Sequence, residues 1–291
     1  MNQQQPHNAI RFPTWLKRGM GFSGRHGEVA GLLSTNNLNT VCSEAKCPNR
    51  GECFSRGSAA FLILGSVCTR NCAFCGVESG LPSAVDYDEG KRLAEAAAQM
   101  GLSHVVVTSV TRDDLHDGGA SAFADVIKHL RGKVPQATIE VLIPDFQGSI
   151  DALMTVLDNR PDILNHNMET VHRLYPSIRP QAIYAQSLKL LKRAADDNRS
   201  VVKSGIMAGL GETVDEVKEL LQDLRSSGCT IVTIGQYLRP SLHQTPVEEF
   251  ISPSQFSAYE EAALRMGFKH VFCGPYVRSS YRAEEMYLNR K

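Results

Sequence analysis

The sequence has 291 residues, of which 42% are hydrophobic and 21% charged, so the chain is long enough to bury the core of one barrel-sized domain. Lys and Arg total 31 and Asp and Glu also total 31, and a formal net charge of zero gives no electrostatic reason to expect nucleic acid or an anionic membrane as a partner. No apolar run is long enough to span a membrane, and the first ten residues lack the apolar core of a secretory signal, so we expect a cytoplasmic protein with reduced cysteines.

From residue 59 onward, buried strands are predicted to alternate with amphipathic helices. Short continuous apolar runs indicate strands buried on both faces, and apolar positions at helical spacing indicate the helices between them. Thr213 and Glu216 form an expected capping box, and Gly101 is an expected helix C-cap. The expected strands are 59–66, 104–110, 137–145, 161–167, 200–211, 230–238 and 270–277, and the expected helices are 89–102, 120–133, 149–158, 181–197, 213–228 and 252–267.

This alternation is typical of βαβ units with a parallel sheet. Six or seven such units in about 220 residues favour an α/β fold of the partial TIM-like (β/α)6 type. The first 55 or so residues look irregular. We therefore divide the chain into an N-terminal extension at 1–57, a barrel at 58–268 and a C-terminal tail at 269–291. Because chemistry in such barrels takes place at the carboxyl ends of the strands, the polar and glycine-rich stretches after each strand are candidate site residues.

Three of the eight cysteines follow the first expected strand at C-x3-C-x2-C spacing: Cys68, Cys72 and Cys75. Cysteines in a cytoplasmic protein indicate metal binding or catalysis before disulfides. Three thiolates in one loop can hold three irons of a [4Fe–4S] cluster and leave the fourth iron free to bind a small molecule. A zinc knuckle is the alternative, but zinc sites use C-x2-C pairs with a matching second pair, so the spacing favours the iron–sulfur interpretation.

A second group of three cysteines lies upstream at C-x4-C-x5-C spacing: Cys42, Cys47 and Cys53. Taken alone, this spacing fits a zinc site as well as an incomplete iron–sulfur site. Beside the C-x3-C-x2-C motif it suggests a second cluster that is again one protein ligand short.

The chain resembles the lipoyl synthase family of radical S-adenosylmethionine (SAM) enzymes over essentially its whole length. The resemblance rests on both cysteine groups and on the stretches DDLHDGGA, DILNHNMETV, GLGET, IGQYLRP and GPYVRSSYRA. It implies insertion of sulfur at C6 and C8 of an octanoyl chain that is attached to a lysine of a carrier protein. It also implies two [4Fe–4S] clusters and SAM as cofactors. The C-x3-C-x2-C cluster would bind SAM and the other, auxiliary cluster would donate the sulfur, so the clusters carry the chemistry and no catalytic protein residue is assigned.

The resemblance also implies a fourth ligand for the auxiliary cluster, a serine of the R-S-S-Y motif at 278–281. We favour Ser280, and spacing alone leaves Ser279 open. Serine oxygen is a poor match for a soft iron–sulfur centre, which suits a cluster that is taken apart during the reaction. Phe74 matches the aromatic residue that is usual before the last cysteine of the SAM-binding motif.

Further SAM contacts follow from the same resemblance. Gly118 and Gly119 would let the backbone approach the methionine end of SAM, or they form a plain turn. Asn165 and Glu169 would bind the ribose or the amino-acid moiety of SAM, or Asn165 or Asn167 would cap a helix.

The expected protein partners are an octanoylated lipoyl carrier and an electron donor such as ferredoxin or flavodoxin. The carrier would be the glycine cleavage H protein or the E2 component of a 2-oxoacid dehydrogenase. One alternative is another sulfur-inserting radical SAM enzyme, such as a biotin synthase or a methylthiotransferase, but these lack the paired C-x4-C-x5-C and R-S-S-Y motifs. A non-catalytic iron–sulfur protein is a second alternative, which explains two clusters but not three-cysteine sites at a barrel mouth.

Overall fold

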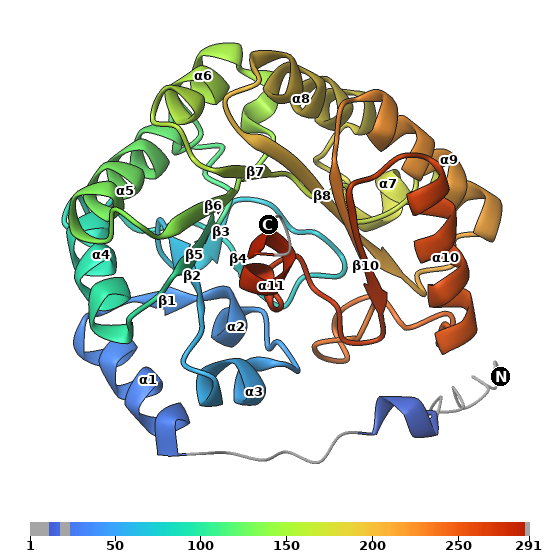
Figure 1. Cartoon of the computed structure of the whole chain (residues 1–291), viewed down its shortest axis with the longest axis horizontal. Coiled ribbons are helices and arrows are strands. Elements are labelled where there is room, and N and C mark those ends of the chain that lie inside the picture. The colour runs from blue at the N-terminus through green and yellow to red at the C-terminus, as the bar shows by residue number, and fades with distance from the viewer. Residues whose placement is uncertain (1–11, 18–23, 289–291) are drawn as a thin grey trace, which may run out of the picture.

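The structure, a computed structural model, describes residues 12–17 and 24–288, apart from the side chains of 286–288. It shows an arc of helices around a curved wall of strands (Figure 1). The first ten residues, on which the expected lack of a secretory signal rests, lie outside the described residues. Within the described residues, no helix combines the length and apolar character needed to cross a membrane.

One eight-stranded sheet forms the wall, in the order β1-β2-β5-β6-β7-β8-β9-β10. All neighbouring strands are parallel except β1, which pairs antiparallel with β2. A separate two-stranded sheet, β3 with β4, flanks the Cys68–Cys75 loop. The strands are β1 (Asn39–Thr40), β2 (Ala60–Ile63), β3 (Val67–Cys68), β4 (Glu78–Ser79), β5 (His104–Ser109), β6 (Thr138–Leu142), β7 (Ile163–Asn165), β8 (Val201–Ala208), β9 (Ile231–Gln236) and β10 (His270–Gly274).

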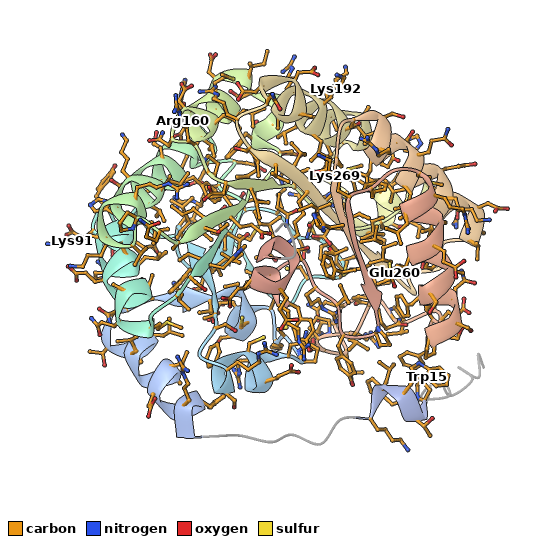
Figure 2. The ribbon with its side chains drawn as sticks, in the orientation of Figure 1. Trp15, Lys91, Arg160, Lys192, Glu260 and Lys269 are labelled. Atoms are coloured by element: carbon orange, nitrogen blue, oxygen red, sulfur yellow. The ribbon has the colours of Figure 1, made fainter. Side chains whose placement is uncertain are left out.

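In the described part of the chain, six βα units and the final strand β10 build the partial barrel, so the predicted fold is confirmed. The outer helices are α4 (Glu89–Met100), α5 (Ala120–Lys133), α6 (Ile150–Asp158), α8 (Tyr184–Asp197), α9 (Val214–Ser226) and α10 (Pro253–Arg265). The predicted caps are also confirmed: Gly101 ends α4 in the left-handed conformation, and Thr213 with Glu216 forms the capping box of α9. In Figure 2 the labelled Lys91 and Lys192 point away from the sheet, as expected for the polar faces of helices that pack on it.

Short helical segments complete the loops at the carboxyl ends of the strands. They are η2 (Phe146–Gly148), η3 (His172–Leu174) and α7 (Tyr175–Ile178), and a further one, η1 (Thr14–Leu16), lies near the N-terminus. The Tyr276 hydroxyl donates a hydrogen bond to the Leu16 carbonyl, so the N-terminal segment lies beside the segment that follows β10.

The prediction that the first 55 or so residues are irregular is wrong for residues 24–55. Most of residues 24–55 belong to α1 (Gly24–Thr35), α2 (Val41–Glu44) and α3 (Arg50–Ser55), and β1 extends the sheet. Three glycines weaken the helical pattern of α1, because each lowers helix propensity by about 1 kcal/mol relative to Ala. Tertiary packing overrides this weakness: Val29 and Leu33 of α1 are buried in the same core cluster as Phe54.

The chain after β10 turns back into the barrel. β10 extends the sheet to Gly274, beyond residue 268 where we expected the barrel to end. The following residues 277–280 line the interior cavity, and Glu284 accepts a hydrogen bond from Ser103, which precedes β5. Ser103 lies at the amino end of the barrel, so the last helix, α11 (Ala283–Leu288), covers that end and lies at the centre of Figure 1.

Candidate active site

A cavity of about 320 Å³ lies at the carboxyl ends of the strands. The loops after β5, β6, β7 and β9, the strand β8 and the C-terminal tail contribute to its walls. Five of the six cysteines in the two groups line it: Cys42, Cys47, Cys68, Cys72 and Cys75. The fold thus brings two cysteine groups that are separate in sequence to one space.

Arg70 holds the Cys68–Cys75 loop to the barrel. Its guanidinium donates two hydrogen bonds to Asp113, at 2.6 and 2.9 Å, and two to Asp145, at 2.9 and 2.7 Å. Burial alone would lower the pKa of Arg70, but the hydrogen bonds with Asp145 and Asp113 outweigh it and raise that pKa above its usual range. Asp113 follows β5 and Asp145 follows β6, so a single side chain ties the loop to two parts of the barrel mouth.

Backbone contacts fix the same loop further. The Thr111 N–H lies 3.3 Å from the Cys68 sulfur, and the Ala73 N–H donates to the Ile178 carbonyl at 2.9 Å. The Asn71 N–H donates to the Gln181 side chain at 2.7 Å. These partners belong to the loops after β5 and β7, so the barrel itself determines the position of the C-x3-C-x2-C motif.

The other cysteine group depends on the C-terminal tail. α2 begins at Thr40, whose side chain accepts a hydrogen bond from the Ser43 N–H, and this helix carries the buried Cys42. The Asn49 side chain donates to the Tyr276 carbonyl at 2.7 Å. Glu52 of α3 accepts from the Tyr281 hydroxyl at 2.8 Å. The tail therefore packs on the segment that carries Cys42, Cys47 and Cys53.

Burial opposes the ionisation of three thiols of the two groups. Burial, with a smaller contribution from the neighbouring thiols of each group, raises the pKa of Cys42 to about 11 and those of Cys53 and Cys75 to about 12. A coordinated metal deprotonates such thiols outright. Among the described residues, no three Cys, His, Asp or Glu side chains surround a space that suits one metal ion. A zinc ion needs sulfur ligands about 2.3 Å away, whereas a cluster spreads its ligands over several irons.

Arg179 indicates that a ligand with an anionic group fits the cavity. Its side chain is buried and donates to the carbonyls of Asn167 and Met168 at 2.9 and 3.2 Å. Its Nε has no hydrogen-bond partner among the described residues, and the residue lines the cavity near Cys72. A buried donor without a partner is costly, so a polar group of a ligand is the expected partner. We did not identify Arg179 from the sequence, because it lies in a loop that carries no motif.

The Gly118–Gly119 pair forms a turn at the start of α5. Both residues have positive φ values, 61° and 91°, which L side chains rarely adopt. A Cβ on Gly119 would lie 2.3 Å from Leu64 Cδ1. Neither glycine is among the residues that line the cavity. The turn conformation and the close approach to Leu64 therefore explain why glycine is needed here.

The residues after β7 divide between the cavity and the barrel interior. Glu169 lines the cavity, as do Phe74 and Asn167, whereas Asn165 is fully buried and donates to Glu140 at 3.2 Å. The helix-capping alternative for Asn165 or Asn167 is wrong, because η3 has Val171 as its N-cap. From the sequence, Asn167 is expected only as a helix cap.

Glu169 is held in an unusual backbone conformation at the cavity wall. Its φ of 66° is rare for a residue other than glycine, and its side chain accepts from Asn167 Nδ2 at 3.0 Å. Burial raises the pKa of Glu169, and Arg179 and the Asn167 hydrogen bond oppose that shift. Strained, partly buried polar residues of this kind are concentrated at functional sites.

The two serines of the R-S-S-Y motif differ in their contacts. Both line the cavity, but the Ser279 hydroxyl donates to Asn167 Oδ1 at 2.8 Å. The Ser280 hydroxyl makes no hydrogen bond to any described residue. Two glycines make room for this segment: a Cβ on Gly235 would lie 2.0 Å from the Val277 carbonyl, and one on Gly205 would lie 2.5 Å from Ser279 Oγ.

Comparison with known proteins gives a family. The model of the Radical SAM superfamily matches residues 62–224. The lipoyl synthase of Caldanaerobacter subterraneus subsp. tengcongensis is 53% identical over 276 residues, which cover 94% of this chain and 96% of that protein. The lipoyl synthase of Caldicellulosiruptor saccharolyticus is 56% identical over 274 residues, with coverage of 94% and 96%.

Solved structures share the fold at low sequence identity. Methylornithine synthase (PylB) has a TM-score of 0.55 at 16% identity, over 86% of this chain and 76% of its own. HydG, a maturase of the [FeFe]-hydrogenase, has a TM-score of 0.58 at 19% identity, over 77% of this chain and 52% of its own.

Proposed function

Because this chain belongs to the lipoyl synthase family of radical SAM enzymes, we propose that the residues around its cavity convert a protein-bound octanoyl group into a lipoyl group. The family relation makes it an enzyme that uses [4Fe–4S] clusters and SAM and that acts on an octanoylated carrier protein. The observation that supports the residue assignment best is that five of the six cysteines, from both groups, line one cavity together with Ser279 and Ser280.

Cys68, Cys72 and Cys75 would hold the SAM-binding cluster, which together with SAM supplies the radical chemistry that removes hydrogen from unactivated methylene groups. Acid–base side chains could not remove such hydrogens, because these have no useful acidity. Arg70 would keep the thiol loop in place, and its four hydrogen bonds to Asp113 and Asp145 support that role.

The polar residues that line the cavity near Cys72 would orient SAM. The unpartnered Nε of Arg179 suits a carboxylate, and Glu169 with Asn167 offers acceptors and donors for the amino or ribose groups. Phe74 would pack against the ligand beside Cys75. Asn165 and the Gly118–Gly119 turn would support this wall from outside the cavity.

Cys42, Cys47, Cys53 and Ser280 would hold the auxiliary cluster, which is the sulfur-donating substrate of the reaction. The free hydroxyl of Ser280 and the engaged hydroxyl of Ser279 favour Ser280 as the ligand. In this arrangement the N-terminal extension at 1–57 and the tail at 269–291 would act together, while the barrel at 58–268 binds SAM. Because α11 covers the amino end of the barrel, the octanoyl chain would enter through the mouth.

The natural carrier would be the glycine cleavage H protein or the E2 component of a 2-oxoacid dehydrogenase. Ferredoxin or flavodoxin would supply the electrons. These finer assignments follow from the chemistry that the family requires, since each SAM cleavage consumes one electron and the octanoyl chain must arrive on a carrier lysine.

The direct test is anaerobic reconstitution followed by turnover with SAM, a reductant and an octanoylated peptide. We expect about eight irons per chain, 5′-deoxyadenosine, and a lipoyl peptide identified by its mass. Stoichiometric zinc would contradict the proposal. So would about four irons with Cys42, Cys47 and Cys53 still open to alkylation.

Substitution of Ser280 tests the fourth ligand. Ser280→Ala and Ser280→Cys should still bind both clusters and cleave SAM, while lipoyl formation falls sharply. The cysteine variant should bind its cluster more tightly, because thiolate suits iron better than serine oxygen does. Ser279→Ala is the matched neighbour: full lipoyl formation by Ser280→Ala with loss in Ser279→Ala would move the ligand by one residue.

A further inference from the structure

A buried ion pair lies inside the barrel, below the cavity. Lys203 of β8 and Glu140 of β6 are both fully buried, and Lys203 Nζ lies 2.8 Å from Glu140 Oε1. His104 and Asn165 contact the same carboxylate, each at 3.2 Å. The interior of such barrels is normally filled by branched apolar side chains, and burying charges is costly. The proposed chemistry uses neither Lys203 nor Glu140, so the pair needs another explanation.

The Lys203 ammonium reaches the serine motif. It donates to the Ser279 carbonyl oxygen at 2.6 Å, across 76 positions of sequence. That carbonyl belongs to the rigid peptide plane that leads directly into Ser280. The Ser279 hydroxyl is held at the same time by Asn167. Lys203 holds the Ser279 carbonyl and Asn167 holds the Ser279 hydroxyl. These two contacts fix the orientation of the peptide that joins Ser279 to Ser280, and so the position of Ser280.

The walls around these two contacts are shaped for the tail. Gly205 lies two residues after Lys203 on β8, and a Cβ there would lie 2.5 Å from Ser279 Oγ and 2.6 Å from Asn167 Oδ1. Burial would raise the pKa of Glu140, but Lys203 and His104 outweigh it and hold that pKa at about 2, so the carboxylate stays charged opposite Lys203. The ammonium thus contacts Glu140 on one side and donates to the Ser279 carbonyl of the tail on the other.

We propose that Lys203 is a positioning residue for sulfur insertion, which holds the Ser279–Ser280 peptide so that Ser280 faces the auxiliary cysteines. This inference rests on the proposed function. Lys203 contacts the tail and the barrel interior, and it is not among the residues that line the cavity. Its loss should therefore affect the use of the auxiliary cluster and leave SAM cleavage intact.

A pair of variants isolates the contact. Glu140→Gln removes the buried negative charge but keeps a Lys203 amine, which donates a hydrogen bond whether or not it is charged. Glu140→Gln with Lys203→Met removes both charges together, so no charge is left buried without a partner, and it deletes the donor to Ser279. The two variants thus differ in the donor that contacts the Ser279 carbonyl.

Two readouts are needed. Hydrogen–deuterium exchange on the full-length reconstituted protein, without SAM or substrate, measures how well the backbone amides of the tail at 275–282 are protected. Turnover with the octanoylated peptide gives the ratio of lipoyl product to 5′-deoxyadenosine. We expect the tail of the double variant to lose protection and its product ratio to fall about tenfold to a hundredfold. Glu140→Gln should stay near wild type in both.

Equal tail exchange and equal product ratios in the two variants, whether high or low, would overturn the inference. If wild type forms no lipoyl product, the proposed function fails, but the exchange difference at 275–282 still tests whether Lys203 positions the tail.

Gly205→Ala provides an independent variant should the double variant fail to fold. It pushes Ser279 off the wall without altering a buried charge, so it should give the same low ratio of lipoyl product to 5′-deoxyadenosine. Gly132→Ala on α5 is its control, because a Cβ there would meet no atom within 4 Å. A normal ratio in Gly205→Ala would contradict the positioning role.

Discussion

The two cysteine groups share a cavity but are held by different parts of the chain. The loop with Cys68, Cys72 and Cys75 is fixed by barrel loops, chiefly through Arg70 with Asp113 and Asp145. The segment with Cys42, Cys47 and Cys53 is fixed by the opposite end of the chain. Its contacts Asn49–Tyr276, Glu52–Tyr281 and Arg56–Glu285 span 227, 229 and 229 positions.

This difference shows that one cavity can depend on two separate supports. Changes in the barrel mouth should disturb the C-x3-C-x2-C group, and changes in the tail should disturb the other group. Each of the following changes acts on one support and leaves the other in place.

Removing one thiol from each group should have the largest effect. Cys72→Ala should abolish SAM cleavage, by about a thousandfold or more, because it removes a ligand of the SAM-binding cluster. Cys47→Ala should still form 5′-deoxyadenosine but transfer no sulfur. Product and 5′-deoxyadenosine are measured on the same samples. A near wild-type yield of lipoyl product from Cys47→Ala would remove the distinction between the two groups.

Removing the contacts of Arg70, which support the cysteine loop on the barrel side, should reduce SAM cleavage nearly as much. Arg70→Met leaves the buried Asp145 carboxylate without its partner, so we expect the free energy of unfolding to fall by about 3–5 kcal/mol and SAM cleavage to fall with it. Arg92→Met is the control, since its pair with Asp86 is partly exposed and worth at most about 1 kcal/mol. Urea unfolding compares the two, and equal losses would show that the Arg70 contacts are not a special support.

Lowering the pH should destabilise the folded protein on the barrel side, because His166 must then be protonated. Burial lowers the pKa of His166 to about 4, and Arg179 lowers it further, from an ordinary value of 6.5. Between these values the unfolded chain binds more protons than the folded one, so stability falls as the pH drops from 6.5 towards 4. The loss should reach about 3 kcal/mol.

The control for this pH effect is His166→Gln. The variant should be less stable at neutral pH, because His166 contacts the Ile143 carbonyl and the Ser187 hydroxyl. Its stability should nevertheless depend less on pH across the same window. An unchanged slope of unfolding free energy against pH would rule out His166 as the titrating group.

Loosening the tail-side support at one hydrogen bond should have the smallest effect. Tyr281→Phe removes the hydroxyl that donates to Glu52 at 2.8 Å, which should cost about 1 kcal/mol. The ratio of lipoyl product to 5′-deoxyadenosine should fall modestly, with SAM cleavage unchanged. A fall in SAM cleavage of the same size as the fall in product would mean that the tail supports both cysteine groups.

Local sequence determined the barrel elements well. Strands with continuous apolar runs and helices with strong amphipathic spacing form from neighbouring residues, as α9 with its capping box illustrates. The same logic failed for residues 24–55. α1 carries three glycines and a weak apolar face, and it is helical because Val29 and Leu33 pack into the core. Packing partners that are distant in sequence leave no periodic pattern.

The candidate site divides in the same way. The cysteine spacings are local, so the sequence by itself pointed to two clusters and to their family. Only the tertiary structure decided that Asn167 rather than Asn165 reaches the cavity, because β7 ends at Asn165 and the chain then leaves the regular alternation of a strand. It alone also showed that the tail runs down the barrel interior against Gly205 and Lys203. Contacts across 76 or 227 positions depend on how the whole chain closes, and no local spacing encodes that closure.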